Sequence, residues 1–286
     1  MKTTDAMIAA AVPLLWGLGL VVAKPVVETF PPILLMALRF SVAALLLVWF
    51  APMPKRHLAA LALVALVGST LQYGLTFNGL KRLDAGTTAL IVQAEVVFLV
   101  IIAAIWLGER LGLRQIIGMV VAFAGLWIVY GTPRLQGQEV GIAMVLGGGL
   151  FWAFGQVMVR RLGDLGGVTT VAWVSVLAAP QLIVLSLVVE GDPRPALVEA
   201  DWRVWISVLY LGVMMTALAY ACWYHVLGKY QAGQVGPFLL MTPVASVLGG
   251  ALFLGEPLTR EIVLGGAVLI AGVGVLVIEK SEVSDR

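Results

Sequence analysis

Ten long apolar runs occupy most of this 286-residue chain, and only short breaks separate them. A helix needs about 20 apolar residues to cross the hydrocarbon core of a bilayer. In that core only helices and closed barrels satisfy their backbone polar groups, and these runs lack the strict alternation of barrel strands. The sequence therefore predicts an all-α membrane protein with ten transmembrane helices, near residues 7–24, 32–50, 58–80, 87–107, 114–131, 140–160, 169–189, 203–225, 234–254 and 262–279.

The composition excludes a water-soluble enzyme, a disordered chain and a coiled coil. Apolar residues make up 61% of the chain and charged residues 12%, whereas soluble globular proteins are about 45–50% apolar and about 25% charged. The net charge is +2 and there is no long basic tract, so we expect no nucleic-acid partner. The single cysteine, Cys222, allows no internal disulfide.

An even number of spans places both termini on the same side of the membrane. If that side is the cytoplasm, ten lysines and arginines lie inside and seven outside, while Arg39 falls within the second helix. This distribution agrees with the positive-inside rule. We therefore expect both termini in the cytoplasm.

The second half of the chain repeats the first. A shift of 147 positions works for most of the repeat, and a shift of 136 works better near its start. The matched positions include Tyr220 with Tyr73, Ala232-Gly233 with Ala85-Gly86, Leu254-Gly255-Glu256 with Leu107-Gly108-Glu109, Gly265 with Gly118, Gly272 with Gly125, and Trp152 with Trp16. We expect one repeat at 1–131, a linker at 132–139 and a second repeat at 140–286.

Each repeat holds five predicted helices, an odd number. The second copy must therefore enter the membrane from the opposite face, which gives two inverted five-helix repeats around a central cavity. Inverted repeats are typical of secondary transporters, in which the substrate binds near the middle of the membrane where the repeats meet. The sequence favours a transporter over a receptor or a channel.

Short motifs in both halves also resemble those of a known family. They are Leu14-Leu15-Trp16-Gly17, Ala37-Leu38-Arg39-Phe40, Leu107-Gly108-Glu109-Arg110, Leu240-Met241-Thr242-Pro243-Val244 and Leu254-Gly255-Glu256-Pro257-Leu258-Thr259. In these stretches the chain resembles the EamA-type transporters of the drug/metabolite transporter superfamily. The resemblance implies ten helices in two inverted repeats, and outward movement of small metabolites across a bacterial inner membrane.

Within that family the chain looks most like bacterial amino-acid exporters, namely those for cysteine and O-acetylserine and those for aromatic amino acids. Pro31-Pro32 and the stretch from Ala85 to Arg110 favour that branch. One departure is Val96, where many members carry proline, although Pro243 keeps the proline in helix 9. The departure predicts that the two halves bend differently.

Two charged residues lie near the middle of predicted helices, Arg39 in the second and Glu95 in the fourth. A charge at that depth costs at least about 2.5–3.5 kcal/mol and usually has a partner. One interpretation is an Arg39–Glu95 ion pair that ties two helices together. The other is that Glu95 faces the cavity, where it binds a substrate ammonium group or takes up a proton during transport.

Aromatic and polar residues at matched positions are candidates for the substrate pocket. Trp16 and Trp152 lie in the first helix of each repeat, and Gln156 shares a face with Trp152. Their indole faces can hold an ammonium group or stack on an aromatic ring. The other candidates are Tyr73, Phe77, Tyr220, Tyr224, Met241 and Thr242, of which the last stands at the repeat position of Glu95. Helix packing and interfacial aromatic belts are the alternative roles.

Known catalytic and nucleotide-binding motifs are missing from the sequence. There is no phosphate-binding Gly-x-x-x-x-Gly-Lys-Ser/Thr loop, no His-Glu-x-x-His motif and no Gly-x-Ser-x-Gly elbow. We therefore expect no enzyme activity, no cofactor and no metal. A selective channel would need a ring of repeated polar groups, which is not evident.

The predicted function is secondary export of amino acids, aromatic and other neutral ones included, with broad specificity and alternating access. Export of drugs or other small metabolites is the alternative. The expected partners are a small-molecule substrate and the lipid bilayer, and we expect the chain to act as a monomer.

Overall fold

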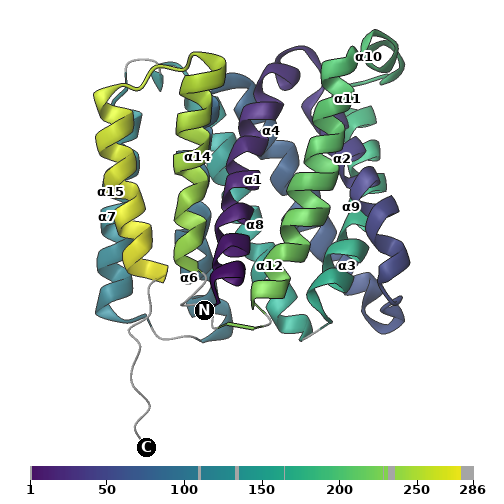
Figure 1. Ribbon diagram of the computed structural model, residues 1–286, viewed down its shortest axis with the longest axis horizontal. Coiled ribbons are helices and arrows are strands. Elements are labelled where there is room, and N and C mark those ends of the chain that lie inside the picture. The colour runs from purple at the N-terminus through teal and green to yellow at the C-terminus, as the bar shows by residue number, and fades with distance from the viewer. Residues whose placement is uncertain are drawn as a thin grey trace, which may run out of the picture.

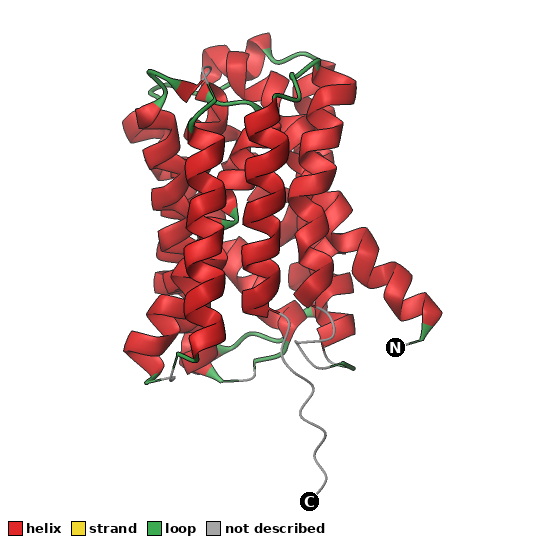
Figure 2. Ribbon diagram, turned by 90° about the vertical axis from the view of Figure 1, so that its left-hand side faces the viewer, coloured by secondary structure: helices red, strands yellow, loops and turns green. Residues whose placement is uncertain are grey.

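The computed structural model describes residues 2–108, 111–132, 135–163, 165–227, 229–230 and 236–277. All regular structure in these ranges is helical, and the long helices stand side by side in one bundle (Figure 2). The side chain of Tyr224, a predicted pocket residue, lies outside the described part of the structure.

The first half of the chain supplies one set of helices. They are α1 (Thr3–Thr29), α2 (Pro32–Leu47), η1 (Val48–Phe50), η2 (Lys55–His57), α3 (Leu58–Ala65), η3 (Leu66–Leu71), α4 (Gln72–Arg82), α5 (Ala85–Val92), α6 (Ala94–Leu107) and α7 (Leu113–Tyr130). The third predicted helix is thus built from α3, η3 and α4, and the fourth from α5 and α6.

The second half supplies a corresponding set. It comprises α8 (Glu139–Leu162), α9 (Gly167–Val189), α10 (Arg194–Glu199), α11 (Trp202–Leu209), η5 (Tyr210–Leu218), α12 (Ala219–Leu227), η6 (Gly236–Leu240), α14 (Met241–Gly249), η7 (Gly250–Leu254) and α15 (Arg260–Val277). Short α10 lies in the loop between α9 and α11, at the opposite end of the bundle from the N-terminus (Figure 1).

Eight stretches of the described chain are long and apolar enough to cross a membrane. They are Thr3–Thr29, Pro32–Phe50, Lys55–Arg82, Ala85–Leu107, Leu113–Tyr130, Glu139–Leu162, Gly167–Val189 and Trp202–Trp223. Phe238–Leu254 adds a shorter apolar helix. The chain is therefore an all-helical, multi-pass membrane protein.

The two ends of the bundle can be told apart by the loops that they carry. We call the end with Lys2, Pro52–Pro54 and Gly163 the N-terminal face, and the end with Phe30, Leu83 and Glu190 the distal face (Figure 1).

The helices near the centre are interrupted at matched positions. The third run of each half contains a π-helical segment, η3 in the first and η5 in the second. The fourth run breaks at Gln93, between α5 and α6, and the ninth changes from η6 to α14 after Leu240, which the shift of 147 pairs with Gln93. The break at Gln93 occurs although Val96 replaces the proline, so the missing proline does not keep this helix straight.

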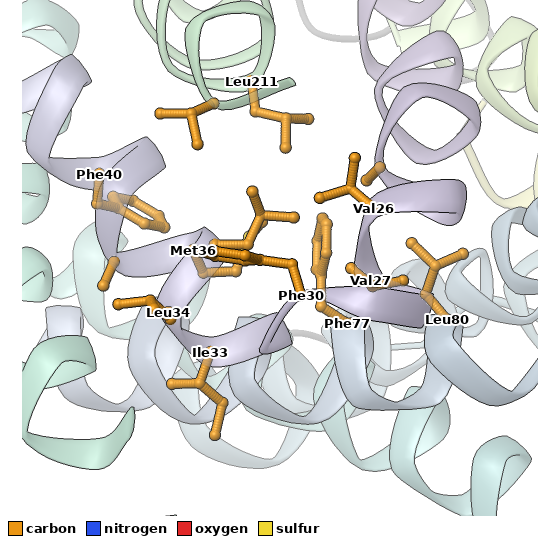
Figure 3. Packing of buried hydrophobic residues seen from close by; sticks show 14 of the residues in the cluster. Val26, Val27, Phe30, Ile33, Leu34, Met36, Phe40, Phe77, Leu80 and Leu211 are labelled. Atoms are coloured by element: carbon orange, nitrogen blue, oxygen red, sulfur yellow. The ribbon is translucent and has the colours of Figure 1, made fainter. Parts of the chain in front are cut away.

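A packed apolar layer closes the centre of the bundle towards the distal face. It joins the end of α1, the start of α2 and the end of α4, through buried Val26, Phe30, Met36, Phe77 and Leu80 (Figure 3). In a membrane such a layer stabilises the association of helices through close van der Waals packing. The layer separates the centre of the bundle from the distal face, where a small cavity of about 10 Å³ lies beside Gly86 and Glu256.

Candidate functional site

A cavity of about 60 Å³ lies between the two halves of the chain. A space of that size holds a few water molecules or part of a small solute. The first half contributes Phe40, Val64, Gly68, Ser69 and Tyr73, and the second contributes Trp152, Gly155, Gln156, Val159, Thr170, Val171, Val174, Ser175, Thr216 and Tyr220. The lining is thus aromatic and aliphatic with several hydroxyl groups and one amide.

The cavity lies nearer the N-terminal face than the distal face. Val159 lies within one turn of the end of α8, and Thr170 within one turn of the start of α9. The apolar layer described above lies on the other side of the cavity, towards the distal face. The arrangement is asymmetric, with the space at one end and dense packing at the other.

The buried guanidinium of Arg39 lies directly behind the cavity wall. Its Nε donates to Thr216 Oγ1 at 2.7 Å, and a terminal nitrogen donates to the Tyr73 hydroxyl at 3.3 Å. Its central carbon lies 4.5 Å from the centre of the Tyr73 ring and 5.3 Å from that of Phe40. Three lining residues therefore contact this one cation.

Aromatic rings from both halves pack together beside the cavity. Trp16 on α1 donates through Nε1 to the Met215 carbonyl oxygen at 2.9 Å. Its ring centre lies 5.2 Å from that of Tyr220, which lines the cavity, and 6.0 Å from that of Trp223. Trp16 thus supports the Tyr220 ring from behind.

Two carboxylates of the second half hold helices of the first half at the distal face. Glu190, just after α9, accepts hydrogen bonds from the backbone N–H groups of Ile33 and Leu34 at 2.8 and 3.0 Å, and from the Ser186 hydroxyl at 2.8 Å. A carboxylate at a helix N-terminus satisfies orphan donors and complements the helix dipole. Glu190 therefore stabilises contact between the halves at this face.

Glu256, in the loop after η7, makes the equivalent contact with α5. It accepts from the backbone N–H groups of Ala85 and Gly86 at 2.5 and 2.9 Å. Burial raises the pKa of the Glu256 carboxyl above its ordinary value, although both N–H groups act in the opposite direction. Glu256 thus stabilises the start of α5 at the same face where Glu190 stabilises the start of α2.

A different polar cluster joins the halves at the N-terminal face. The Asp5 carboxylate on α1 accepts from the Tyr230 hydroxyl at 2.8 Å and lies 3.3 Å from His225 Nε2 and 3.5 Å from Lys229 Nζ. These groups link the first turn of α1 to the end of α12, on the side of the bundle where the cavity lies.

Comparison with known proteins places this architecture in a family. The model of the EamA-like transporter family matches the chain twice, over residues 4–131 and 139–278. The chain belongs to the EamA-like transporter family. As a member of a transporter family it is a transporter and not an enzyme.

Curated relatives match this EamA chain over nearly its full length. A protein of Salmonella typhimurium and one of Escherichia coli, each named "Probable amino-acid metabolite efflux pump", are both 29% identical to it over 282 residues, covering 95% of this chain and 94% of the relative. A solved crystal structure superposes with a TM-score of 0.65 at 18% identity, covering 96% of each chain. The superposition confirms the fold alone.

The cavity of this EamA chain contains four of the residues that the sequence put forward. Tyr73, Trp152, Gln156 and Tyr220 line it. Trp16 is not among the lining residues but packs against the ring of Tyr220, which is. Their role in binding a substrate stays a prediction.

Three other predicted pocket residues lie elsewhere. Phe77 is 1% exposed and belongs to the apolar layer, because it sits one turn beyond Tyr73 towards the distal face. Thr242 and Met241 begin α14, which packs on α1 and α5, and the Thr242 carbonyl lies against Gly17. Lying on the same helix face as a cavity residue was therefore not enough to place Phe77 in the cavity, because the helix continues past the end of the cavity.

The predicted Arg39–Glu95 ion pair is wrong for the described structure. The described ion pairs do not include it, and Arg39 contacts Thr216 and Tyr73 instead. α2 packs against α9 and η5, whereas Glu95 on α6 lies against Gly149 of α8. Equal depth in the membrane did not imply that the two helices are neighbours. Glu95 also lies outside the cavity lining.

Sequence reasoning missed most of the hydroxyl groups in the lining. Thr216 precedes Tyr220 by four residues and Ser69 precedes Tyr73 by four, so each shares a helix face with a residue that was singled out. That spacing could have identified both. Ser175 and Thr170 on α9 carry no comparable signal, because serine and threonine are common in apolar helices.

Proposed function

We propose that the chain is a secondary transporter that exports amino acids, aromatic and other neutral ones included, by alternating access. The observation that carries this proposal is the cavity between the two halves, with a packed apolar layer between it and the distal face. Its aromatic and hydroxyl lining suits a zwitterion with a variable side chain. The names of the relatives from Salmonella typhimurium and Escherichia coli support the amino-acid class.

The proposed architecture is ten spans in two inverted repeats, at 1–131 and 140–286 with a linker at 132–139. Reciprocal contacts between α7 and α15 support it. The two helix backbones approach closely where Gly118 meets Gly272 and where Gly125 meets Gly265. The repeat alignment pairs Gly118 with Gly265 and Gly125 with Gly272, so a two-fold axis in the membrane plane exchanges these two contacts.

A second reciprocal pair lies beside the cavity. Gly19 of α1 contacts Met215 of η5, and Gly155 of α8 contacts Gly68 of η3. The alignment shifts relate Gly19 to Gly155 and Met215 to Gly68. These matched contacts support a transporter whose halves move against each other, as inverted-repeat carriers do.

The proposed orientation puts the N-terminal face, and with it both termini, in the cytoplasm of a bacterial inner membrane. The cavity then lies towards the cytoplasm, where an exporter collects its substrate. The Glu190 and Glu256 contacts then hold the external side closed.

Counterflow into protein-only vesicles tests the proposed function. Vesicles that contain the protein are preloaded in turn with each of the twenty unlabelled amino acids. We expect these vesicles to accumulate the labelled form of several neutral amino acids. Repeating the assay with a proton gradient separates coupled from facilitated transport. Counterflow of none of the amino acids, together with flux of a cationic drug, would replace the amino-acid class by the drug-export alternative.

Changing Trp152 to alanine is expected to weaken apparent affinity for aromatic amino acids about tenfold, and to have a smaller effect on alanine or serine. An aromatic pair contributes about 0.5–1.5 kcal/mol beyond its buried area, and Trp152 lines the cavity. The matched control is Trp127→Ala, because Trp127 on α7 is 75% exposed. Equal changes in Km for the two variants would remove Trp152 from the binding site.

We also propose that Glu95 couples transport to protons. No hydrogen-bond partner for its carboxyl is found among the described residues, and a lone charge in hydrocarbon is costly. Glu95→Gln is expected to flatten the pH dependence of transport while the protein stays at least as stable. Initial rates from pH 5 to pH 8 check this, and an unchanged pH profile would exclude Glu95 from coupling.

A further inference from the structure

The Arg39 guanidinium carries a buried positive charge that no carboxylate of the described chain neutralises. Arg39 is 0% exposed, and its three hydrogen-bond partners, Thr216, Tyr73 and Met36, are all neutral. Burying an unpaired charge is strongly unfavourable, so buried charges are normally paired. The arrangement calls for an anion that the described part of the chain does not supply.

The position of Arg39 indicates where that anion would sit. Phe40, Tyr73 and Thr216 contact the guanidinium and also line the cavity. In a low-dielectric wall the charge acts across this short distance with little screening. The end of the cavity next to α2 is therefore electropositive.

The hydrogen bonds of Arg39 also orient the hydroxyl groups between it and the cavity. Arg39 donates to both hydroxyl oxygens, so each O–H proton must point away from the cation. The Thr216 hydroxyl donates to the Leu211 carbonyl oxygen at 2.8 Å. The Tyr73 hydroxyl has no such acceptor within the described residues, and it remains a donor at the wall, strengthened by the neighbouring cation.

Ser175 provides a second, independent indication of a ligand. It lies on α9, lines the cavity and is 0% exposed, yet its Oγ has no hydrogen-bond partner within the described structure. Leaving a buried hydroxyl without a hydrogen-bond partner is unfavourable. A bound oxygen acceptor would satisfy it.

We propose that Arg39, Tyr73 and Ser175 form the carboxylate-binding end of the transport site, and that its ligands are therefore small molecules with a free carboxylate. This inference rests on the proposed function only in placing the transported substrate in the cavity. The Tyr73 and Ser175 hydroxyls donate to the carboxylate, and Arg39 supplies the compensating charge. The substrate side chain and amino group then face Trp152, Gln156 and Tyr220.

Four matched leucine analogues test the proposal in calorimetric titrations of the purified protein. Leucine and 4-methylpentanoate carry the carboxylate, whereas leucinamide and 3-methylbutylamine do not. The first two are expected to bind, and the last two to bind at least about tenfold more weakly. Equal binding of leucine and leucinamide, or binding of none of the four, would overturn the proposal.

Variants assign the preference to individual groups. Tyr73→Phe and Ser175→Ala are expected to weaken binding of 4-methylpentanoate about tenfold and about threefold, and Arg39→Gln is expected to abolish the preference for leucine over leucinamide. The controls are Tyr130→Phe on α7 and Ser41→Ala, whose hydroxyl bonds to the Ala37 carbonyl within α2. If Arg39→Gln does not fold, the isosteric Tyr73→Phe decides, and unchanged binding there contradicts the proposal.

The outcomes separate this inference from the proposed function. Binding of 4-methylpentanoate without counterflow of any amino acid would support the carboxylate site and contradict amino-acid export. Counterflow of leucine and leucinamide at equal rates would support transport of amino-acid-like solutes and contradict the carboxylate site.

Discussion

Gly155→Ala is expected to lower the transport rate at least about tenfold and to destabilise the protein by about 1–3 kcal/mol, as overpacking a tight contact typically does. A Cβ at Gly155 would lie 2.5 Å from the Gly68 Cα atom, in the backbone of η3. Neither glycine has a side chain that can move aside, so α8 and η3 must separate. Since both residues line the cavity, its wall changes shape.

Gly147→Ala, in the same helix, is the matched control. A Cβ there meets only the flexible Leu75 side chain, at 3.4 Å. Because alanine favours a helix over glycine by about 1 kcal/mol, this variant should be as stable as the parent or more so. Thermal unfolding in detergent and initial counterflow rates check both variants, and similar behaviour of the two would refute a tight contact between α8 and η3.

Glu190→Ala is expected to open the distal face. The substitution removes the acceptor for the Ile33 and Leu34 N–H groups and for the Ser186 hydroxyl. Hydrogen bonds to charged groups contribute about 1.5–3 kcal/mol each, and partial exposure of Glu190 reduces this. A net loss of about 1.4 kcal/mol would raise the distal-open population about tenfold.

Thiol labelling measures this shift. A cysteine at Ala37, buried in the apolar layer, serves as reporter in a Cys222→Ser background. Glu190→Ala should speed its reaction with an impermeant maleimide applied at the distal face. Glu28→Gln is the control, because the Glu28 carboxylate in its ion pair with Lys24 on the same side is exposed, and exposed pairs contribute about 0–1 kcal/mol. Equal labelling in the two variants would show that Glu190 does not hold the face closed.

The sequence was sufficient for the helical membrane fold because long apolar runs leave the backbone few alternatives. It also identified residues that matched a partner in the other repeat: Trp152 and Tyr220 line the cavity, as does Tyr73. Periodicity does not say how far a cavity extends along a helix, and so Phe77 was misplaced by one turn. Nor does depth in the membrane reveal which helices are neighbours, which is why Glu95 was wrongly paired with Arg39.

The contacts at the distal face were equally beyond reach. Glu190 looks like an ordinary loop carboxylate in the sequence, and Glu256 stood out only as part of a repeated Leu-Gly-Glu motif. The function of both depends on helix N-termini more than 150 residues away in the chain. The π-helical segments η3 and η5 each contribute residues to the cavity lining, and they leave no clear signature in the sequence.

The most direct measurement is the accessibility of the cavity itself from each side of the membrane. A cysteine at Ser69, which lines the cavity, is introduced into the Cys222→Ser background in oriented vesicles. Impermeant maleimide should label it from the N-terminal face, substrate should protect it, and Glu190→Ala should add labelling from the distal face while reducing it from the other. Labelling from both faces at once in the parent protein, or from neither under any condition, would contradict alternating access through this cavity.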